Sequence, residues 1–106
     1  MQSKVLISSV KQLYAIAFTH KNLPVETLGL LHIEQENYEN RLKKAKNNFD
    51  LSELYYLSTC NRVEFAFVTE SDMIDRRQHA RHLLTEIYPN ISEELFDLLI
   101  ENAIFH

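Results

Sequence analysis

Four short apolar runs, arranged in a distinctive order, predict an α+β fold for this chain of 106 residues. Amphipathic stretches typical of helices lie between the first and second runs and between the third and fourth, while only a short polar turn separates the middle two. The order strand, helices, strand, strand, helices, strand is that of the ferredoxin-like split βαβ sandwich. We therefore expect one domain over residues 1–106, with a four-stranded antiparallel sheet and helices on one face.

The first half of the chain is expected to contain one strand and two helices. Residues 13–18 form an apolar run that ends at the polar segment 19–22, as a buried strand ending in a loop does. Pro24 suits the first turn of a short helix, where its missing N–H costs nothing. The expected buried face of this helix is Val25, Leu28 and Leu31. A second helix is predicted by apolar residues spaced four, three and four: Tyr38, Leu42, Ala45 and Phe49.

The middle of the chain is expected to form a hairpin. Residues 54–57 and 63–68 have the composition of strands, and the polar segment 58–62 is short enough for the turn between them. The second of these strands alternates between two faces, as strand geometry requires. One face is expected to carry Val63, Phe65 and Phe67, and the other Glu64, Ala66 and Val68.

The last third of the chain is expected to contain two helices and a strand. A long helix is predicted from a cap at Ser71 or Asp72 to about Tyr88, before Pro89. Its expected inner face is Met73, Ala80, Leu83, Leu84 and Ile87. Asn90 with Glu93 resembles a capping box for a further short helix. That helix is expected to carry Leu95 and Leu98. Residues 102–106 resemble the start of a strand, and an apolar end suggests a fragment of a longer chain.

The composition excludes several function classes. The single glycine, Gly29, is too few for a dinucleotide-binding loop or a P-loop, which need about three and two. The single cysteine, Cys60, excludes an intramolecular disulfide and every multi-cysteine zinc site. A net charge of −4 argues against binding nucleic acid through bulk positive charge. The first ten residues contain no long apolar run, so we expect a cytoplasmic protein with a reduced thiol.

Cys60 is the strongest candidate for a reactive group. It stands in the polar turn between Thr59 and Asn61 rather than inside an apolar run, so we expect it to be exposed. Arg62 is two residues away, and a nearby guanidinium stabilises the thiolate, which is the reactive form. The alternative interpretation is a small buried hydrophobic residue without a chemical task.

Arg62 and Glu64 each allow two interpretations. The planar guanidinium of Arg62 suits a carboxylate or a phosphate of a substrate, but it could equally pair with Glu64 or with solvent. Glu64 either lies near the mouth of the turn or is an ordinary polar residue on a half-buried strand. Residue chemistry alone leaves both choices open.

The histidines are weaker candidates. His20 and His106 end the first and last expected strands, where site residues gather but where polar residues without a role are also common. His79 and His82 share one helix face with arginines, so a solvated basic face is favoured over a metal pair. We expect His32, at the end of a short helix, to be structural.

Three segments of the chain resemble the glutamyl-tRNA reductase family. Ser-Thr-Cys-Asn-Arg-Val-Glu at residues 58–64 is similar to the signature that this family carries between two apolar strands. Thr-His-Lys-Asn-Leu-Pro-Val-Glu at residues 19–26 is similar to its His-Lys-x-x-Pro-Val-Glu segment, although Asn22 and Leu23 stand where the family usually has Thr-Ala. Residues 104–106 fall where the family has an aromatic residue followed by histidine, so the resemblance covers nearly the whole chain.

The resemblance implies a reaction that the composition does not. In this family a cysteine thiolate attacks the ester of glutamyl-tRNA, and NADPH then reduces the glutamyl thioester to glutamate-1-semialdehyde for tetrapyrrole synthesis. By similarity, Cys60 would be the nucleophile and His106 an acid, base or positioning group near it. The positions that the resemblance implies for substrate binding are His20, Thr59, Asn61, Arg62 and Glu64.

The resemblance also implies parts and partners beyond this chain. The NADPH-binding and dimerisation domains of the family are missing from it, so we expect no cofactor site here and no completed reduction. The full-length enzyme would form a homodimer and could pass its product to a downstream aminomutase. The alternative is a non-catalytic ferredoxin-like binding or regulatory module with an inert cysteine. A third interpretation, RNA binding without chemistry, fits the net charge of −4 poorly.

Overall fold

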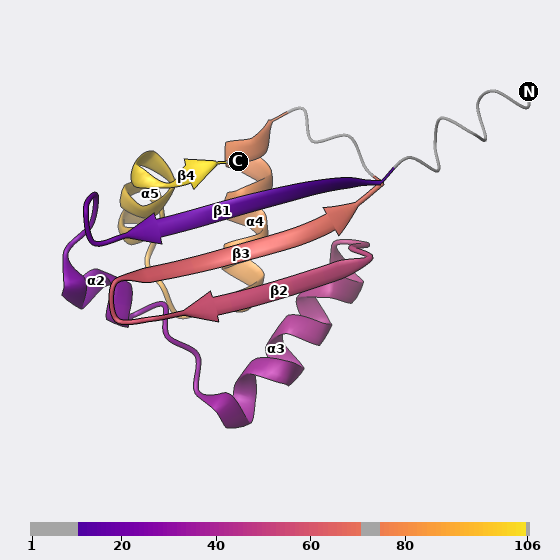
Figure 1. Cartoon of the computed structure of the whole chain (residues 1–106), viewed down its shortest axis with the longest axis horizontal. Helices are drawn as coiled ribbons and strands as arrows, with labels where there is room; N and C mark the ends of the chain where they lie inside the picture. Colours follow the sequence, from indigo (N-terminus) through magenta and orange to yellow (C-terminus); the bar gives the residue numbers. More distant parts are fainter. Residues whose placement is uncertain (1–10, 71–74, 106) are drawn as a thin grey trace, which may run out of the picture.

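The protein folds as a four-stranded antiparallel sheet with helices packed on one face, and this confirms the predicted fold class (Figure 1). The computed structural model describes residues 11–70 and 75–105. The elements are β1 (Gln12–Thr19), α2 (Val25–Gly29), α3 (Gln35–Asn48), β2 (Glu53–Ser58), β3 (Arg62–Thr69), α4 (Arg76–Ile87), α5 (Glu93–Asn102) and β4 (Ile104–Phe105). The strand order in the sheet is β2-β3-β1-β4, so the two central strands are β3 and β1.

The pairing of β1 with β3 fixes the end of the sheet that carries the polar turn. The two strands are in register from Gln12 opposite Thr69 to Thr19 opposite Arg62. The residue after β1, His20, donates its backbone N–H to the carbonyl of Asn61 at 2.9 Å. The loop that leaves β1 is therefore attached to the turn between β2 and β3, and segments about forty residues apart in the sequence meet there.

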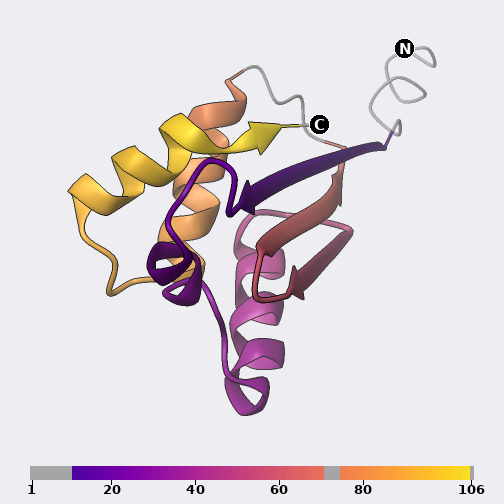
Figure 2. The same ribbon diagram turned by 60° about the vertical axis from the view of Figure 1, so that its left-hand side comes forward.

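The core lies between the sheet and the helices, as the turned view in Figure 2 shows. The predicted alternation of β3 is confirmed, because Val63, Phe65 and Phe67 are buried while Glu64 on the other face is half-exposed. The inner face predicted for α3 is also confirmed: Leu42 and Ala45 are buried, and Tyr38 and Phe49 pack against the core.

Val25 does not belong to the buried face predicted for the first short helix. Its side chain is 56% exposed, whereas Leu28 and Leu31 are buried. At 3.6 residues per turn Val25 lies about 60° from Leu28 around the axis of α2, so the burial of Leu28 does not require that Val25 is buried.

The helices that follow the hairpin begin later than the sequence indicated. The N-cap of α4 is Asp75, whose side chain accepts from the backbone N–H of Gln78 at 3.2 Å. The predicted caps, Ser71 and Asp72, and the predicted core residue Met73 lie outside the described residues. The rest of the inner face of α4 is buried as predicted: Ala80, Leu83, Leu84 and Ile87.

The cap predicted for α5 was wrong, and the two apolar residues that the sequence singled out are not its most buried ones. Ser92, not Asn90, caps this helix and accepts the N–H of Leu95 at 3.2 Å. Leu95 only packs partly against the core, and Leu98 is 41% exposed. The buried residues are instead Phe96, Leu99 and Ile100. Their spacing of three and four residues is that of one helix face, adjacent to the face that the sequence favoured.

Two tyrosine hydroxyls hold the loop between α2 and α3. The hydroxyl of Tyr88, which follows α4, donates to the backbone carbonyl of Leu31 at 2.5 Å. Tyr56 on β2 donates to the same carbonyl at 3.3 Å and accepts the N–H of Ile33 at 2.9 Å. Burial raises the pKa of Tyr88, so its hydroxyl keeps the proton that it donates. We call this arrangement of Tyr56, Tyr88, Leu31 and Ile33 the tyrosine clamp.

The short polar segment between β2 and β3 forms a tight turn, as expected. Thr59 donates its N–H to the carbonyl of Arg62 at 2.8 Å, and its Oγ1 accepts the N–H of Asn61 at 3.3 Å. Cys60 is left at the tip.

Within the described residues, none of the helices has the length and apolar character needed to cross a membrane.

Candidate functional site

Cys60 is a free, exposed thiol at the tip of the β2–β3 turn, as the sequence predicted. The hydrogen bonds of Thr59 fix the backbone on both sides of it, and His20 attaches the loop after β1 to Asn61. The alternative of a buried cysteine is therefore wrong. A thiol in this position is accessible to a ligand and is carried on a turn with a defined shape.

Arg62 pairs with Glu64, one of the partners that the sequence left open for it, and it keeps N–H groups that a ligand can use. Its Nε and Nη2 lie 3.0 and 2.6 Å from Oε1 of Glu64. The sequence suggested that the guanidinium of Arg62 stabilises the Cys60 thiolate. Among the described residues, the contacts found for this guanidinium are with Glu64 and not with the sulfur. A guanidinium has five N–H groups, so two bonds to Glu64 leave three for a ligand.

A cavity of about 290 Å³ lies on the side of the turn that faces the end of β1. We call it the basic cavity, and its lining residues are Thr19, His20, Lys21, Asn61, Arg62 and Ile104. The hydroxyl of Thr19 is buried and has no hydrogen-bond partner among the described residues. An unpaired buried hydroxyl is costly unless a ligand or solvent satisfies it. The cavity contains the cationic side chains of Lys21 and Arg62, which suit a carboxylate.

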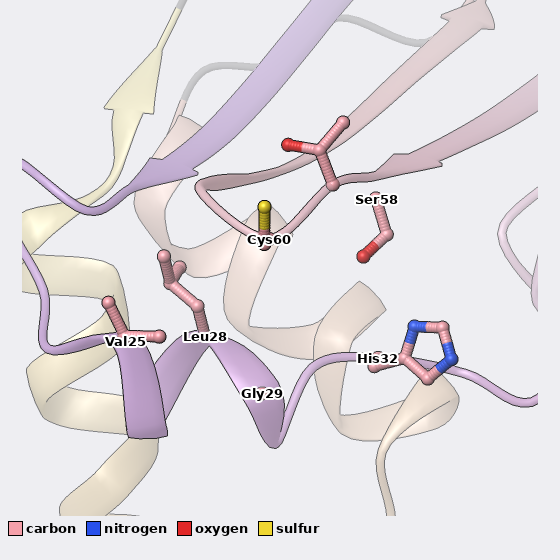
Figure 3. Close-up of a pocket in the computed structure, with 7 residues that line it drawn as sticks. Val25, Leu28, Gly29, His32, Ser58 and Cys60 are labelled. Carbon is pink, nitrogen blue, oxygen red and sulfur yellow. The ribbon is translucent and has the colours of Figure 1, made fainter.

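A second cavity, of about 390 Å³, lies between the turn and α2. We call it the apolar cavity, and besides Thr59 it is lined by Val25, Leu28, Gly29, His32, Ser58 and Cys60. Figure 3 shows Cys60 on the turn above Val25 and Leu28, with Ser58 and His32 to one side. The sulfur is drawn pointing away from α2, so it stands at the rim of this cavity rather than in its floor (Figure 3).

The structure brings together most of the residues that the sequence singled out. Thr59 and Cys60 line the apolar cavity, while His20, Asn61 and Arg62 line the basic one. Glu64 joins the group through its ion pair with Arg62. His106 lies outside the described residues.

Several residues of the two cavities were missed by sequence reasoning. Thr19 and Lys21 flank His20, and the antiparallel register that sets Thr19 opposite Arg62 was the signal that could have found them. His32 was expected to be structural, but it is exposed and lines the apolar cavity. Val25 and Leu28 approach the turn only through the position of α2, which no local pattern predicts.

The described residues do not fit a metal ion or a dinucleotide. No group of three or more His, Cys, Asp or Glu side chains among them is arranged to hold a metal. The one glycine of the chain, Gly29, ends the five-residue helix α2 and has no positive φ. A Rossmann-type dinucleotide site needs a glycine-rich turn that leads from a strand into a helix, and the described residues do not form that turn.

Fold and site together define the class of this protein: a ferredoxin-like α+β domain with an exposed thiol on the turn of its β2–β3 hairpin, between a basic and an apolar cavity. The family model for "Glutamyl-tRNAGlu reductase, N-terminal domain" matches residues 16–106. The chain belongs to this family, as its resemblance predicted.

Curated relatives and a solved structure agree with this assignment. The glutamyl-tRNA reductase of Prochlorococcus marinus is 30% identical over 96 residues, and that of Gloeothece citriformis is 32% identical over 94 residues. Each match covers 86% of this chain but only 22% of the relative. The structure of glutamyl-tRNA reductase from Methanopyrus kandleri superposes with a TM-score of 0.52 at 26% identity, covering 88% of this chain and 18% of that one. The chain therefore spans about a fifth of the length of these relatives.

Proposed function

We propose that this domain captures the glutamyl group of glutamyl-tRNA as a thioester on Cys60. The single observation that carries the proposal is the exposed thiol on the ordered turn beside the basic cavity. The family supports the choice of substrate, because the relatives are glutamyl-tRNA reductases.

The proposed reaction is an acyl transfer without oxidation or reduction. The thiolate of Cys60 attacks the carbonyl carbon of the ester that joins glutamate to the terminal ribose of the tRNA. A carbon–sulfur bond forms, the carbon–oxygen bond to the ribose breaks, and the released ribose oxygen takes up a proton. The products are free tRNA and a glutamyl thioester. Splitting acyl transfer from later chemistry in this way replaces one difficult step by two easier ones.

The basic cavity is proposed to hold the glutamyl side chain. Its γ-carboxylate would accept hydrogen bonds from the N–H groups of Arg62 that Glu64 leaves unused. Lys21 adds a further positive charge at the same cavity. Both bonds from Arg62 go to Oε1 of Glu64, so Oε2 is proposed to accept from the α-ammonium group of the substrate.

Four further positions complete the proposal. Thr59 and Asn61 hold the turn and would present backbone and side-chain groups to the glutamyl chain. His20, bonded to the turn through its backbone, would border the carboxylate. His106 is proposed, on the family resemblance, as the group that gives a proton to the leaving ribose oxygen.

The proposal ends at the thioester. Reduction by NADPH is a property that the family resemblance implies for a longer protein.

The test is to incubate the protein with glutamyl-tRNA labelled in the glutamate and to locate the adduct by mass spectrometry. The expected result is one hydroxylamine-sensitive glutamyl group on Cys60, absent from Cys60→Ser. A matched control moves the thiol: Cys60→Ser combined with Asn40→Cys places it on the exposed surface of α3, away from both cavities. Equal labelling of this control, or of Cys60→Ser alone, would show that the turn has no special reactivity and would end the proposal.

A further inference from the structure

The last strand of the sheet forms one wall of the basic cavity. β4 is two residues long and lies beside β1 at the edge of the sheet (Figure 1). It pairs with β1 at two positions, Phe105 opposite Ile16 and Ile104 opposite Ala17. Ile104 also lines the basic cavity, where it is the one hydrocarbon side chain among the lining residues. A strand this short forms few backbone hydrogen bonds, so the sheet alone holds the wall weakly.

A guanidinium from α4 holds the segment that leads into this strand. α4 packs against α5, and α5 leads directly into β4 (Figure 2). Nη1 of Arg77 donates to the backbone carbonyl of Ile100, in the last turn of α5, at 2.6 Å. The guanidinium carbon of Arg77 lies 5.3 Å from the centroid of the Phe105 ring, which is a cation–π contact. Between these two contacts, the chain changes from helix to strand at Ala103. Arg77 thus spans the junction of α5 and β4.

Two arginines of α4 contact α5, and they do so at different places. Arg81 pairs with two carboxylates in the first half of α5, those of Glu93 and Asp97. Within the described part of the chain, the contacts of Arg77 are instead a carbonyl and a ring at the other end of the helix. α5 has no basic residue in its own last turn. Arg77 therefore supplies the positive charge that the carbonyl end of a helix favours.

The loop that follows β1 meets the same junction. The side-chain amide nitrogen of Asn22 lies 3.5 Å from the backbone carbonyl of Asn102, the last residue of α5. His20 and Lys21, which line the basic cavity, precede Asn22 in this loop. Two walls of the cavity, β4 and the loop after β1, therefore depend on where α5 ends.

We propose that Arg77 is a positioning residue for the basic cavity: it holds the junction of α5 and β4 and thereby keeps Ile104 in the cavity wall. This inference rests on the proposed function, because the ligand that it considers is the glutamyl group. The methylene groups of that ligand would lie against Ile104 while its γ-carboxylate reaches Arg62. If the wall is in place for only a fraction of the time, the apparent affinity of the cavity falls by that fraction.

The first experiment measures binding without acyl transfer. The probe is the α-amide of glutamate, which keeps the ammonium and the γ-carboxylate but has an amide in place of the ester. Its dissociation constant is measured from NMR chemical shifts. Arg77→Ala is expected to raise this constant about tenfold, because it removes a charged hydrogen bond and a cation–π contact from a weakly held strand. Arg77→Lys keeps the charge and can serve one of the two contacts, so an increase of about threefold is expected.

The matched control is Arg81→Ala, which removes the other arginine between α4 and α5. Whatever its effect on stability, it should leave the dissociation constant unchanged, because the ion-pair partners of Arg81 belong to α5 and not to β4. Hydrogen exchange adds a local readout: the amides of β4 should exchange faster in Arg77→Ala relative to those of β3. Equal binding by the wild type and Arg77→Ala, or an equal loss in Arg81→Ala, would overturn the positioning role.

A double variant tests the route through Ile104. Ile104→Ala is expected to weaken binding of the α-amide severalfold by itself, because it removes the hydrocarbon wall of the cavity. If Arg77 acts through the position of this side chain, adding Arg77→Ala then raises the dissociation constant by less than about threefold. A further increase of about tenfold would mean that Arg77 acts by another route, and the inference would fail.

Acylation of Cys60 separates this inference from the proposed function. With glutamyl-tRNA, Arg77→Ala should raise the concentration for half-maximal rate about tenfold and lower the maximal rate by less than about threefold. Binding of the α-amide that depends on Arg77, without acylation of Cys60, would keep the positioning role and end the thioester proposal. Acylation of Cys60 with an unchanged half-maximal concentration in Arg77→Ala would do the reverse. Absence of α-amide binding to the wild type would overturn the positioning role together with the place assigned to the glutamyl side chain.

Discussion

The tyrosine clamp yields a prediction whose magnitude follows from its hydrogen bonds. Tyr88→Phe removes the donor to the carbonyl of Leu31 at 2.5 Å, but that carbonyl keeps the hydroxyl of Tyr56 at 3.3 Å. The loss is then close to the net value of one hydrogen bond, about 1 kcal/mol. Tyr56→Phe costs more, about 2 kcal/mol, because it also leaves the N–H of Ile33 without its acceptor in a residue that is only 3% exposed.

The double variant is expected to cost more than the two single ones together. Without either hydroxyl, the carbonyl of Leu31 loses both donors, and leaving a buried acceptor unpaired adds about 1 kcal/mol beyond additivity. The total expected loss in the free energy of unfolding is about 4 kcal/mol. Phenylalanine keeps both rings in place, so packing against Phe65 contributes little to these differences.

The assay is urea unfolding of the wild type, the two single variants and the double variant, followed by circular dichroism. The slope of the free energy against urea should be equal in all four proteins if only the folded state is changed. Strict additivity, within about 0.3–0.5 kcal/mol, would refute the idea that the two hydroxyls share one carbonyl. A larger loss from Tyr88→Phe than from Tyr56→Phe would refute the role assigned to the N–H of Ile33.

Three further results are expected. Ser92→Ala should lower stability by about 1 kcal/mol in thermal or urea unfolding, whereas Asn90→Ala should change it by less than about 0.5 kcal/mol, because only Ser92 caps α5. Thr19→Val should leave the free energy of unfolding unchanged or raise it by up to about 1 kcal/mol, because it removes a buried hydroxyl without a described hydrogen-bond partner. A clear loss of stability in unfolding experiments would show that this hydroxyl has a hydrogen-bond partner in the folded protein. Burial raises the pKa of Tyr88 in the folded protein above the value of about 10 that tyrosine has in the unfolded chain. The free energy of unfolding is therefore independent of this group below pH about 10, and it falls as the pH rises further, by at most about 1.4 kcal/mol per pH unit. Unfolding measured at several alkaline pH values should show a smaller loss for Tyr88→Phe than for the wild type, and equal losses would contradict this.

The features that were predictable from the sequence are those with a local cause. The alternation in β3 follows from strand geometry, and the face of α3 follows from its spacing, so Phe65 and Leu42 were placed correctly. The cap of α5 was missed because Asn90 and Ser92 both have suitable side chains two residues apart. Which of them caps depends on the path of the chain after α4, and that path is set by packing rather than by local preference.

The site could be predicted only in part for the same reason. The turn with Cys60 and Arg62 was found because its residues are adjacent in the sequence. The two cavities depend on elements that approach the turn from elsewhere: the end of β1 on one side and α2 on the other. The pairing of Arg62 with Glu64 was one of two open choices, because residues two apart on a strand share a face without being obliged to touch.

The ion pair between Arg62 and Glu64 has a consequence for selectivity among anions. Nη2 of Arg62 lies 2.6 Å from Oε1 of Glu64, so the electric fields of the two opposite charges nearly cancel away from the pair. Simple anions such as chloride or phosphate therefore gain little binding energy from this pair. A zwitterion gains from both ends at once, since its negative group meets the guanidinium and its positive group the carboxylate. Under the proposed function, the free ammonium and the carboxylate of the glutamyl group are the complement of this pair of charges, and a plain dicarboxylic acid of the same length lacks the ammonium.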